Sequence, residues 1–272
     1  MPTALTRLTL VLGLAAFMTS AATTLAWAGD ERDIPRLVSF GGSCASCELS
    51  GRKLTGARFL GANFTGASLV GSDLRGASFV GSNFTGADLT RADLRGATMM
   101  GAVFRLANFS DATLSGLEAT GAVFTNANMA RAKFDSAELL GSNFAHVDAR
   151  EASFVGAELH GADLSGGRFE RANFRGATLD AANLAGGLFG GADFKGASFE
   201  HASLRGVDLS SVRNLTQDQL DEACADASTR LPAGLVARGC RAKVIIARPV
   251  KPPKPPTAPA PPRYIVEYAY FR

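Results

Sequence analysis

Between Leu49 and Leu209 the hydrophobic positions of this chain recur every five residues without a change of register. Each fifth residue is Leu, Phe, Met or Ala, and the residue two before it is small, most often Ala. A polar residue usually separates the two, and Gly often follows, as in residues 62–66 (Ala-Asn-Phe-Thr-Gly). A period of five fits neither a helix at 3.6 residues nor a strand at 2. It therefore predicts a solenoid built from a short repeated unit.

Each unit is expected to form a short extended segment followed by a bend. Side chains two residues apart lie on the same face of an extended segment, so the large residue and the small one before it both point inward. Gly supplies the backbone freedom that the bend requires. Where one inward partner is unusual in size the other compensates, in the pairs Leu117 with Ala119, Val147 with Ala149, Gly167 with Phe169 and Gly187 with Phe189. Such exchange of volume indicates a close-packed interior.

The unit closely resembles the pentapeptide repeat, whose pattern is Ala-(Asp/Asn)-Leu-X-X. The resemblance covers about 165 of the 272 residues and departs from the pattern at Arg52, which stands at a small inward position. It implies an all-β fold, a right-handed quadrilateral β-helix with four repeats in each coil. We then expect about eight coils and a rod roughly 35–40 Å long, since adjacent strands lie about 4.8 Å apart.

Charged residues give a separate indication of four repeats in a coil. Charges alternate in sign along Arg91, Asp111, Arg131, Glu151 and Arg171, each of which stands four repeats after the previous one. If four repeats make one coil, these residues form a ladder on one outer edge, where opposed unlike charges stabilise neighbouring strands. The same spacing predicts a column of buried aromatic rings formed by Phe64, Phe84, Phe104, Phe124 and Phe144.

The segment before the repeats has the features of a secretory signal peptide, over residues 1–28. It has a basic Arg7, an apolar stretch and a small-x-small site that ends at Ala28. Thr and Ser residues interrupt the apolar stretch too early for a membrane-spanning helix of about 20 residues. We therefore expect cleavage after Ala28, no transmembrane segment in the mature chain, and a periplasmic or secreted protein. Residues 29–43 are expected to cover the first coil of a β-helix formed by residues 44–212.

After the repeats, residues 213–241 are expected to form a helical cap and residues 242–272 a basic, proline-rich tail. Thr216 and Gln219 have the spacing of a capping box at the start of a short helix. The proline-rich stretch is typical of an extended linker, and a strand-prone segment follows it with Tyr264, Tyr268, Tyr270 and Phe271. From Arg230 onward, nine Lys or Arg residues accompany one acidic residue. The tail is interpreted as a tether to a partner or to an anionic surface, or else as a disordered tail.

Cysteines occur only at the two ends of the repeat region, Cys44 and Cys47 before it and Cys224 and Cys240 after it. In an exported chain they indicate two disulfides. Because the rod separates the two pairs, the local bridges Cys44–Cys47 and Cys224–Cys240 are expected. The alternative is a thiol–disulfide redox protein that uses Cys44 and Cys47 as a Cys-x-x-Cys site. That motif usually opens a helix, whereas here it leads directly into the repeats.

No constellation of residues for catalysis is visible in the sequence. The three histidines, His146, His160 and His201, fall at outward positions, and the glycines follow the period of five rather than a phosphate-loop pattern. We expect no enzymatic activity, no cofactor and no metal site. The best-known activity of the family is DNA mimicry by an acidic rod, but residues 44–212 hold 15 Lys or Arg and 17 Asp or Glu. Topoisomerase inhibition is therefore the less favoured alternative, and no nucleic-acid partner is expected.

With catalysis and DNA mimicry disfavoured, recognition through the surface is the remaining function. We expect a structural or protein-interaction scaffold in the cell envelope that binds another protein or a second copy of itself. Outward apolar residues stack at the four-repeat spacing in two rows, Leu60 with Val80 and Met100, and Val103 with Val123. These rows are candidate contact surfaces, although single exposed apolar residues are ordinary. Short basic steps are expected at Arg75 with Arg95 and at Arg175 with Lys195.

Overall fold

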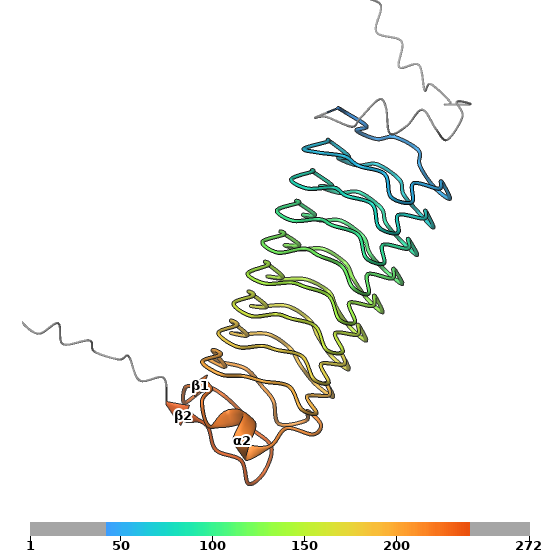
Figure 1. The fold of residues 1–272 in the computed structure, drawn as a ribbon. Coiled ribbons are helices and arrows are strands. Elements are labelled where there is room, and N and C mark those ends of the chain that lie inside the picture. The colour runs from blue at the N-terminus through green and yellow to red at the C-terminus, as the bar shows by residue number, and fades with distance from the viewer. Residues whose placement is uncertain (1–41, 240–272) are drawn as a thin grey trace, which may run out of the picture.

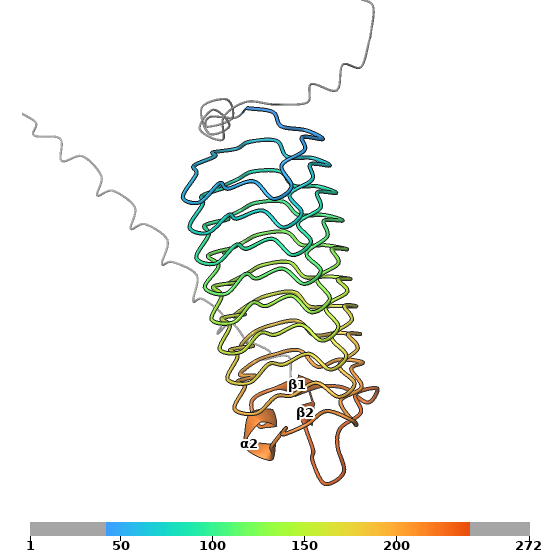
Figure 2. The ribbon, with the colours of Figure 1, turned by 90° about the vertical axis from the view of Figure 1, so that its right-hand side faces the viewer.

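The computed structural model describes residues 42–239 of the chain. Over most of this range the chain winds in coils that stack along one axis (Figures 1 and 2). Parallel β-bridges join each coil to the next and pair residues four repeats apart, from Ser43 with Asn63 to Asp193 with Arg213. The coil of four repeats that the charge pattern indicates is confirmed.

The hydrogen bonds of one repeat show why five residues suffice. The N–H of Phe64 donates to the carbonyl of Asn83 in the next coil (2.7 Å), and the N–H of Asn83 donates back to Ala62 (2.9 Å). The bend is closed by a bond from the N–H of Ala67 to the carbonyl of Phe64 (3.0 Å). Gly66 within that bend has a φ of 63°, in the left-handed region that glycine adopts without steric cost.

Non-glycine residues also occupy this left-handed position in some repeats. All five members of the predicted charge ladder do so, with φ between 57° and 61°, namely Arg91, Asp111, Arg131, Glu151 and Arg171. An L-residue in this region costs roughly 1–2 kcal/mol. The ladder therefore stands where the repeat otherwise places Gly, at the corner between two faces of the rod.

The winding begins two residues before the start of the β-helix predicted from the sequence. Ser43 pairs with Asn63, and the N–H of Cys44 donates to the carbonyl of Asn63 (2.7 Å). Cys44 is only 7% exposed and occupies the large inward position of a unit formed by residues 42–46. Gly42 and Ser43, which the sequence assigns to an N-terminal cover, thus belong to the coil.

Stacked aromatic rings fill the interior. The predicted column is confirmed, with ring centroids 4.8 Å apart for Phe64 and Phe84 and 5.1 Å apart for Phe104 and Phe124. A second column runs through Phe134, Phe154, Phe174 and Phe194. Rings of neighbouring columns meet edge to face, as Phe134 and Phe144 do at 6.0 Å. The core is therefore one continuous hydrophobic cluster along the rod.

At the C-terminal end the chain forms α2 (Gln217–Leu220), β1 (Cys224–Ala225) and β2 (Arg238–Gly239), with β1 parallel to β2. The N–H of Thr216 donates to the side chain of Gln219 (2.8 Å), as expected for a capping box. The helix has only one turn, because β1 returns to the coil and Cys224 pairs with Ser203. Strand pairing here satisfies backbone groups of the last coil that a helix would leave unpaired.

The segment predicted to be a helical cap thus mostly continues the winding. Its bridges, Ser203 with Cys224 and Asp208 with Arg230, span slightly more chain than those of the repeats, and α2 lies within both of these longer turns. Leu220 of α2 is fully buried. Within residues 42–239, no helix has the length and apolar character needed to cross a bilayer.

Candidate functional site

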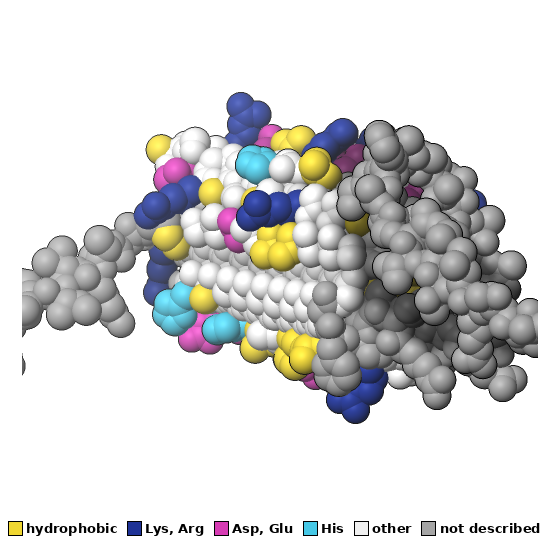
Figure 3. Space-filling view, turned by 90° about the horizontal axis from the view of Figure 1, so that it is seen from above, with side chains coloured by type: hydrophobic (Ala, Val, Ile, Leu, Met, Phe, Trp, Pro, Cys, Tyr) yellow, Lys and Arg dark blue, Asp and Glu magenta, His cyan; other side chains and the backbone are white. Residues whose placement is uncertain are grey.

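The outward side chains lie in rows parallel to the long axis, because equivalent residues of successive coils are paired by β-bridges. Figure 3 shows such rows, with coloured apolar and charged side chains beside rows of white atoms. The rod has four faces, one for each repeat of a coil. Any function of residues 42–239 that depends on contact with another molecule must use these faces or the two ends.

The predicted apolar row of Leu60, Val80 and Met100 lies on one face, because the residues two positions earlier in each repeat are paired in successive β-bridges, Arg58 with Ser78 and Ser78 with Thr98. Leu60 is 55% exposed and Met100 44% exposed, while Val80 is half-buried. Val103 and Val123 are paired on the next face and are both half-buried. Tyr264, Tyr268, Tyr270 and Phe271 lie outside the described residues. The structure therefore brings together one exposed apolar row among the predicted site residues.

The predicted charge ladder is confirmed by its ion pairs. Nε and Nη2 of Arg131 donate to Oδ1 and Oδ2 of Asp111, both at 2.7 Å. Arg171 donates to Glu151 one coil further along. The attraction of Arg131, and less strongly of Arg91, lowers the pKa of Asp111. Both carboxylates of the ladder are therefore paired with an arginine.

The first basic step expected from the sequence, Arg75 with Arg95, is neutralised by neighbouring carboxylates. In an extended segment the residues on either side of an inward side chain project to the same outer surface. Carboxylates therefore face Arg75 at Asp73 (2.7 Å) and Arg95 at Asp93 (2.6 Å). In the second step Arg175 lies 3.8 Å from Asp193, which also accepts a hydrogen bond from the backbone N–H of Lys195. Hydrogen bonds from Arg75 and Arg95 lower the pKa of Asp73 and Asp93.

We predict that acid lowers the melting temperature of the rod. The pKa values of Asp73, Asp93, Asp111 and Asp148 are lowered chiefly by arginine hydrogen bonds, and that of Asp226 falls to about 2 through the Ser228 hydroxyl. A carboxylate with a lowered folded pKa stabilises the fold above its unfolded pKa of about 4, and this stabilisation is lost as the pH falls through the folded value.

Circular dichroism melts between about pH 5 and pH 2 at constant ionic strength measure this effect. The double variant Asp73→Asn/Asp93→Asn is expected to show a smaller fall in melting temperature across the same range. A wild-type melting temperature that is the same at both ends of the range would contradict the prediction.

Stacked glutamates on the face of Leu60 are a feature that reasoning from the sequence missed. Glu118 pairs with Glu138, and Glu138 with Glu158, in successive β-bridges. Thr98 donates its hydroxyl to Glu118 (3.1 Å), but in the described part of the chain no Lys or Arg forms an ion pair with these three residues. The four-repeat spacing of the three glutamates was visible in the sequence and could have revealed the stack.

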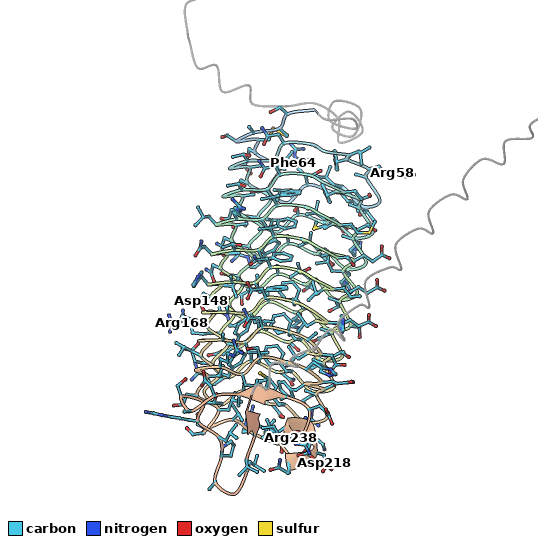
Figure 4. All side chains as sticks on the ribbon, turned by 90° about the vertical axis from the view of Figure 1, so that its left-hand side faces the viewer. Arg58, Phe64, Asp148, Arg168, Asp218 and Arg238 are labelled. Carbon is cyan, nitrogen blue, oxygen red and sulfur yellow. A yellow bond between two sulfur atoms is a disulfide. The ribbon has the colours of Figure 1, made fainter. Side chains whose placement is uncertain are left out.

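Acidic residues continue from this stack toward the C-terminal end of the same face. Asp180 and Glu200 follow in the neighbouring row. A shallow groove between the last coil and α2 is lined by Glu200, Asp218 and Glu222. Figure 4 shows Asp218 on the same side of the rod as Arg58, and Asp148 with Arg168 on the other side. We call this surface, from Arg58 to Glu200, the acidic face.

The histidines and cysteines of the described residues do not form a metal-binding cluster. His146, His160 and His201 are all exposed, and residues 42–239 contain no group of His, Cys, Asp or Glu arranged to hold a metal ion. Cys44 and Cys47 form a disulfide between adjacent inward positions of the first coil. Cys224 in β1 is also disulfide-bonded, and its expected partner Cys240 lies outside the described residues.

Comparison with known proteins agrees with a solenoid of stacked pentapeptides. One family model, described as pentapeptide repeats, matches residues 43–79, 67–105 and 172–210, and a second, described as a pentapeptide repeat region, matches residues 87–164. The chain belongs to the pentapeptide-repeat family. No curated protein matches it at the significance required.

Solved structures similar to this chain include two that are described as pentapeptide repeat proteins, HetL and a plant protein. HetL, involved in heterocyst differentiation regulation in the cyanobacterium Nostoc sp. strain PCC 7120, is 26% identical over 70% of this chain and 92% of its own, with a TM-score of 0.46. QnrB1, a plasmid-mediated fluoroquinolone resistance protein, is 25% identical over 69% and 88%, with a TM-score of 0.33. A protein of the Arabidopsis thaliana thylakoid lumen is 32% identical over 46% and 72%, with a TM-score of 0.23.

Proposed function

We propose that this protein is an exported, non-enzymatic scaffold that binds other proteins of the cell envelope through the faces of its rod. The observation that carries the proposal is the Cys44–Cys47 disulfide within the first coil. Structural disulfides form and persist in oxidising compartments outside the cytosol. The leader-like sequence of residues 1–28 supports the same destination.

Burial of Cys44 favours a structural disulfide over a redox-active pair. Redox-active cysteines must be accessible to their partners, whereas Cys44 is 7% exposed and packs with the core at the large inward position of its repeat. Cys47 packs against the same core one position further along. The bridge thus replaces an inward Leu or Phe at the start of the rod, where it holds the first corner.

Contact with a partner is supported by the rigid, regular surface. Every coil presents its outward residues at the same positions, and the exposed apolar side chains of Leu60 and Met100 lie in one row. Exposed apolar surface in line with charged groups is typical of a protein contact. The described coils supply this surface without a cleft that encloses a substrate, so the proposed activity is binding.

Expression in a Gram-negative host tests the proposal. We expect the chain in the periplasmic fraction with Gly29 at its N-terminus, and no reaction of the unreduced, denatured protein with a thiol-alkylating reagent. A matched chain without residues 2–28 is expected to remain in the cytosol and to be alkylated. Retention of the full chain in the cytosol would refute export, and alkylation of Cys44 or Cys47 in the exported chain would favour the redox alternative.

A further inference from the structure

The acidic face differs in charge from the rest of the rod. It carries five carboxylates, and its one Lys or Arg residue, Arg58, lies in the first coil; the carboxylates belong to Glu118, Glu138, Glu158, Asp180 and Glu200. Elsewhere in the described residues the repeats place opposite charges together, as in the pairs of Arg131 with Asp111 and Arg95 with Asp93. Asp73 and Asp93 are also in register, but each is paired with an arginine, whereas no Lys or Arg of the acidic face lies beside Glu118, Glu138 and Glu158.

The glutamate stack has an energetic cost in the isolated rod. Like charges directly opposite each other on neighbouring strands are destabilising, and Glu118, Glu138 and Glu158 are opposite each other in successive coils. A cationic segment lying across the stack would remove this repulsion. The arrangement is therefore complementary to a basic chain running along the rod.

Apolar residues occupy the other half of the same face. Leu60, Val80 and Met100 precede the glutamates along the axis, so the face is mainly apolar toward the N-terminal end, while toward the C-terminal end carboxylates accompany Leu140 and His160. A complementary segment that starts at the C-terminal end of the rod and runs toward the N-terminal end must therefore carry its basic residues first and its apolar residues afterwards.

The C-terminal segment of this chain has that order. Residues 240–272 contain seven Lys or Arg and one acidic residue. Five of the basic residues, Arg241, Lys243, Arg248, Lys251 and Lys254, come first, and the aromatic residues Tyr264, Tyr268, Tyr270 and Phe271 come last. The described chain ends at Gly239 in β2, at the acidic end of the rod (Figure 1).

The segment is also long enough to follow the whole face. An extended chain rich in proline rises about 3.1 Å per residue, so residues 240–272 span roughly 100 Å when extended. Coils are about 4.8 Å apart, which places Leu60 within roughly 40 Å of the last coil. The segment is therefore more than long enough to reach from the acidic half to the apolar half, and about half of its full extension places the aromatic residues beside Leu60.

We propose that residues 241–272 dock on the acidic face of the same molecule. The basic residues lie against Glu118, Glu138 and Glu158, and the terminal aromatic residues lie against Leu60, Val80 and Met100. A protein partner that binds this face must then displace the tail, and the tail is available to that partner only when it has been released. The proposal concerns the isolated chain and does not require export or any partner.

Tyrosine fluorescence anisotropy of the full chain tests the docking. The chain has three tyrosines, all between residues 264 and 270, so their emission reports on the tail alone in a Trp27→Phe background. We expect high anisotropy at low salt and loss of the excess near 1 M salt, where the Debye length is about 3 Å. The variant Glu118→Gln/Glu138→Gln/Glu158→Gln is expected to show the low value already at low salt.

A matched control removes three carboxylates that lie outside the acidic face, Glu48→Gln/Glu151→Gln/Glu170→Gln, and is expected to keep the wild-type anisotropy. Circular dichroism melts establish that each variant is folded. Wild-type anisotropy in the acidic-face variant, or a loss of anisotropy in the control, would overturn the proposal. An anisotropy that rises with protein concentration would overturn it too, since the tail would then be held by a second copy.

Discussion

Replacing Phe104 with Ala is expected to lower the free energy of unfolding by about 3–5 kcal/mol, as for other large-to-small changes at fully buried aromatic residues. Phe104 has no exposed surface and stacks between Phe84 and Phe124, with ring centroids 5.0 and 5.1 Å away. It also meets Phe109 edge to face at 5.2 Å. Removing its ring leaves a cavity within the column, and backbone bonds to the coils on both sides oppose collapse of the cavity.

Urea denaturation followed by circular dichroism measures this loss. Leu106→Ala is the matched control, because Leu106 lies in the same repeat but is 66% exposed, so little buried surface is removed. The control is expected to unfold within about 0.5 kcal/mol of the wild type. Equal stability of Phe104→Ala and the wild type would contradict a packed aromatic column.

The architecture could be predicted because one short rule is repeated along the chain. Inward residues such as Phe104 and Ala102 recur at every fifth position, and the charge ladder from Arg91 to Arg171 indicates the length of a coil. Each coil then repeats the backbone bonds of the previous one, so a correct interpretation of one repeat holds for the rest. The ends obey no such rule, which is why the place of Ser43 in the first coil and the return of Cys224 to the last coil were not predicted.

The surface was less predictable, because the same outward residue has different partners in different coils. Arg75 and Arg95 are adjacent basic residues in successive coils, yet each bonds the carboxylate two positions earlier. Glu118 and Glu138 occupy the same polar position as Asp73, but no arginine stands two positions after them. Whether a charge is neutralised depends on all the neighbouring residues of its face. The alignment of equivalent positions in successive coils does not reveal those neighbours.

The second prediction with a large expected loss of stability concerns the small inward position of the repeat. Gly167 precedes Phe169, and a Cβ atom on Gly167 would lie 2.5 Å from Cε2 of Phe169 and 3.2 Å from the carbonyl oxygen of Leu164. The volume exchange expected from the sequence is thus seen in the packing. Gly167→Ala is expected to destabilise the rod by about 1–3 kcal/mol, the usual range for overpacking a core. This outweighs the roughly 0.4–1 kcal/mol by which Gly-to-Ala changes stabilise a compatible site.

Partial rescue by a second change makes the prediction specific. Phe169→Leu removes the ring that a new Cβ would meet and restores the common Ala-x-Leu repeat, so Gly167→Ala/Phe169→Leu is expected to lose less stability than the two single variants together. Gly190→Ala is the matched control, since a Cβ there would be 3.6 Å from the Ser211 hydroxyl, an ordinary contact. Strictly additive losses in urea denaturation, or equal losses for Gly167→Ala and Gly190→Ala, would show that Phe169 does not exclude a side chain from Gly167. The two inward positions would then be independent, contrary to a core in which each repeat divides a fixed volume between a small residue and a large one.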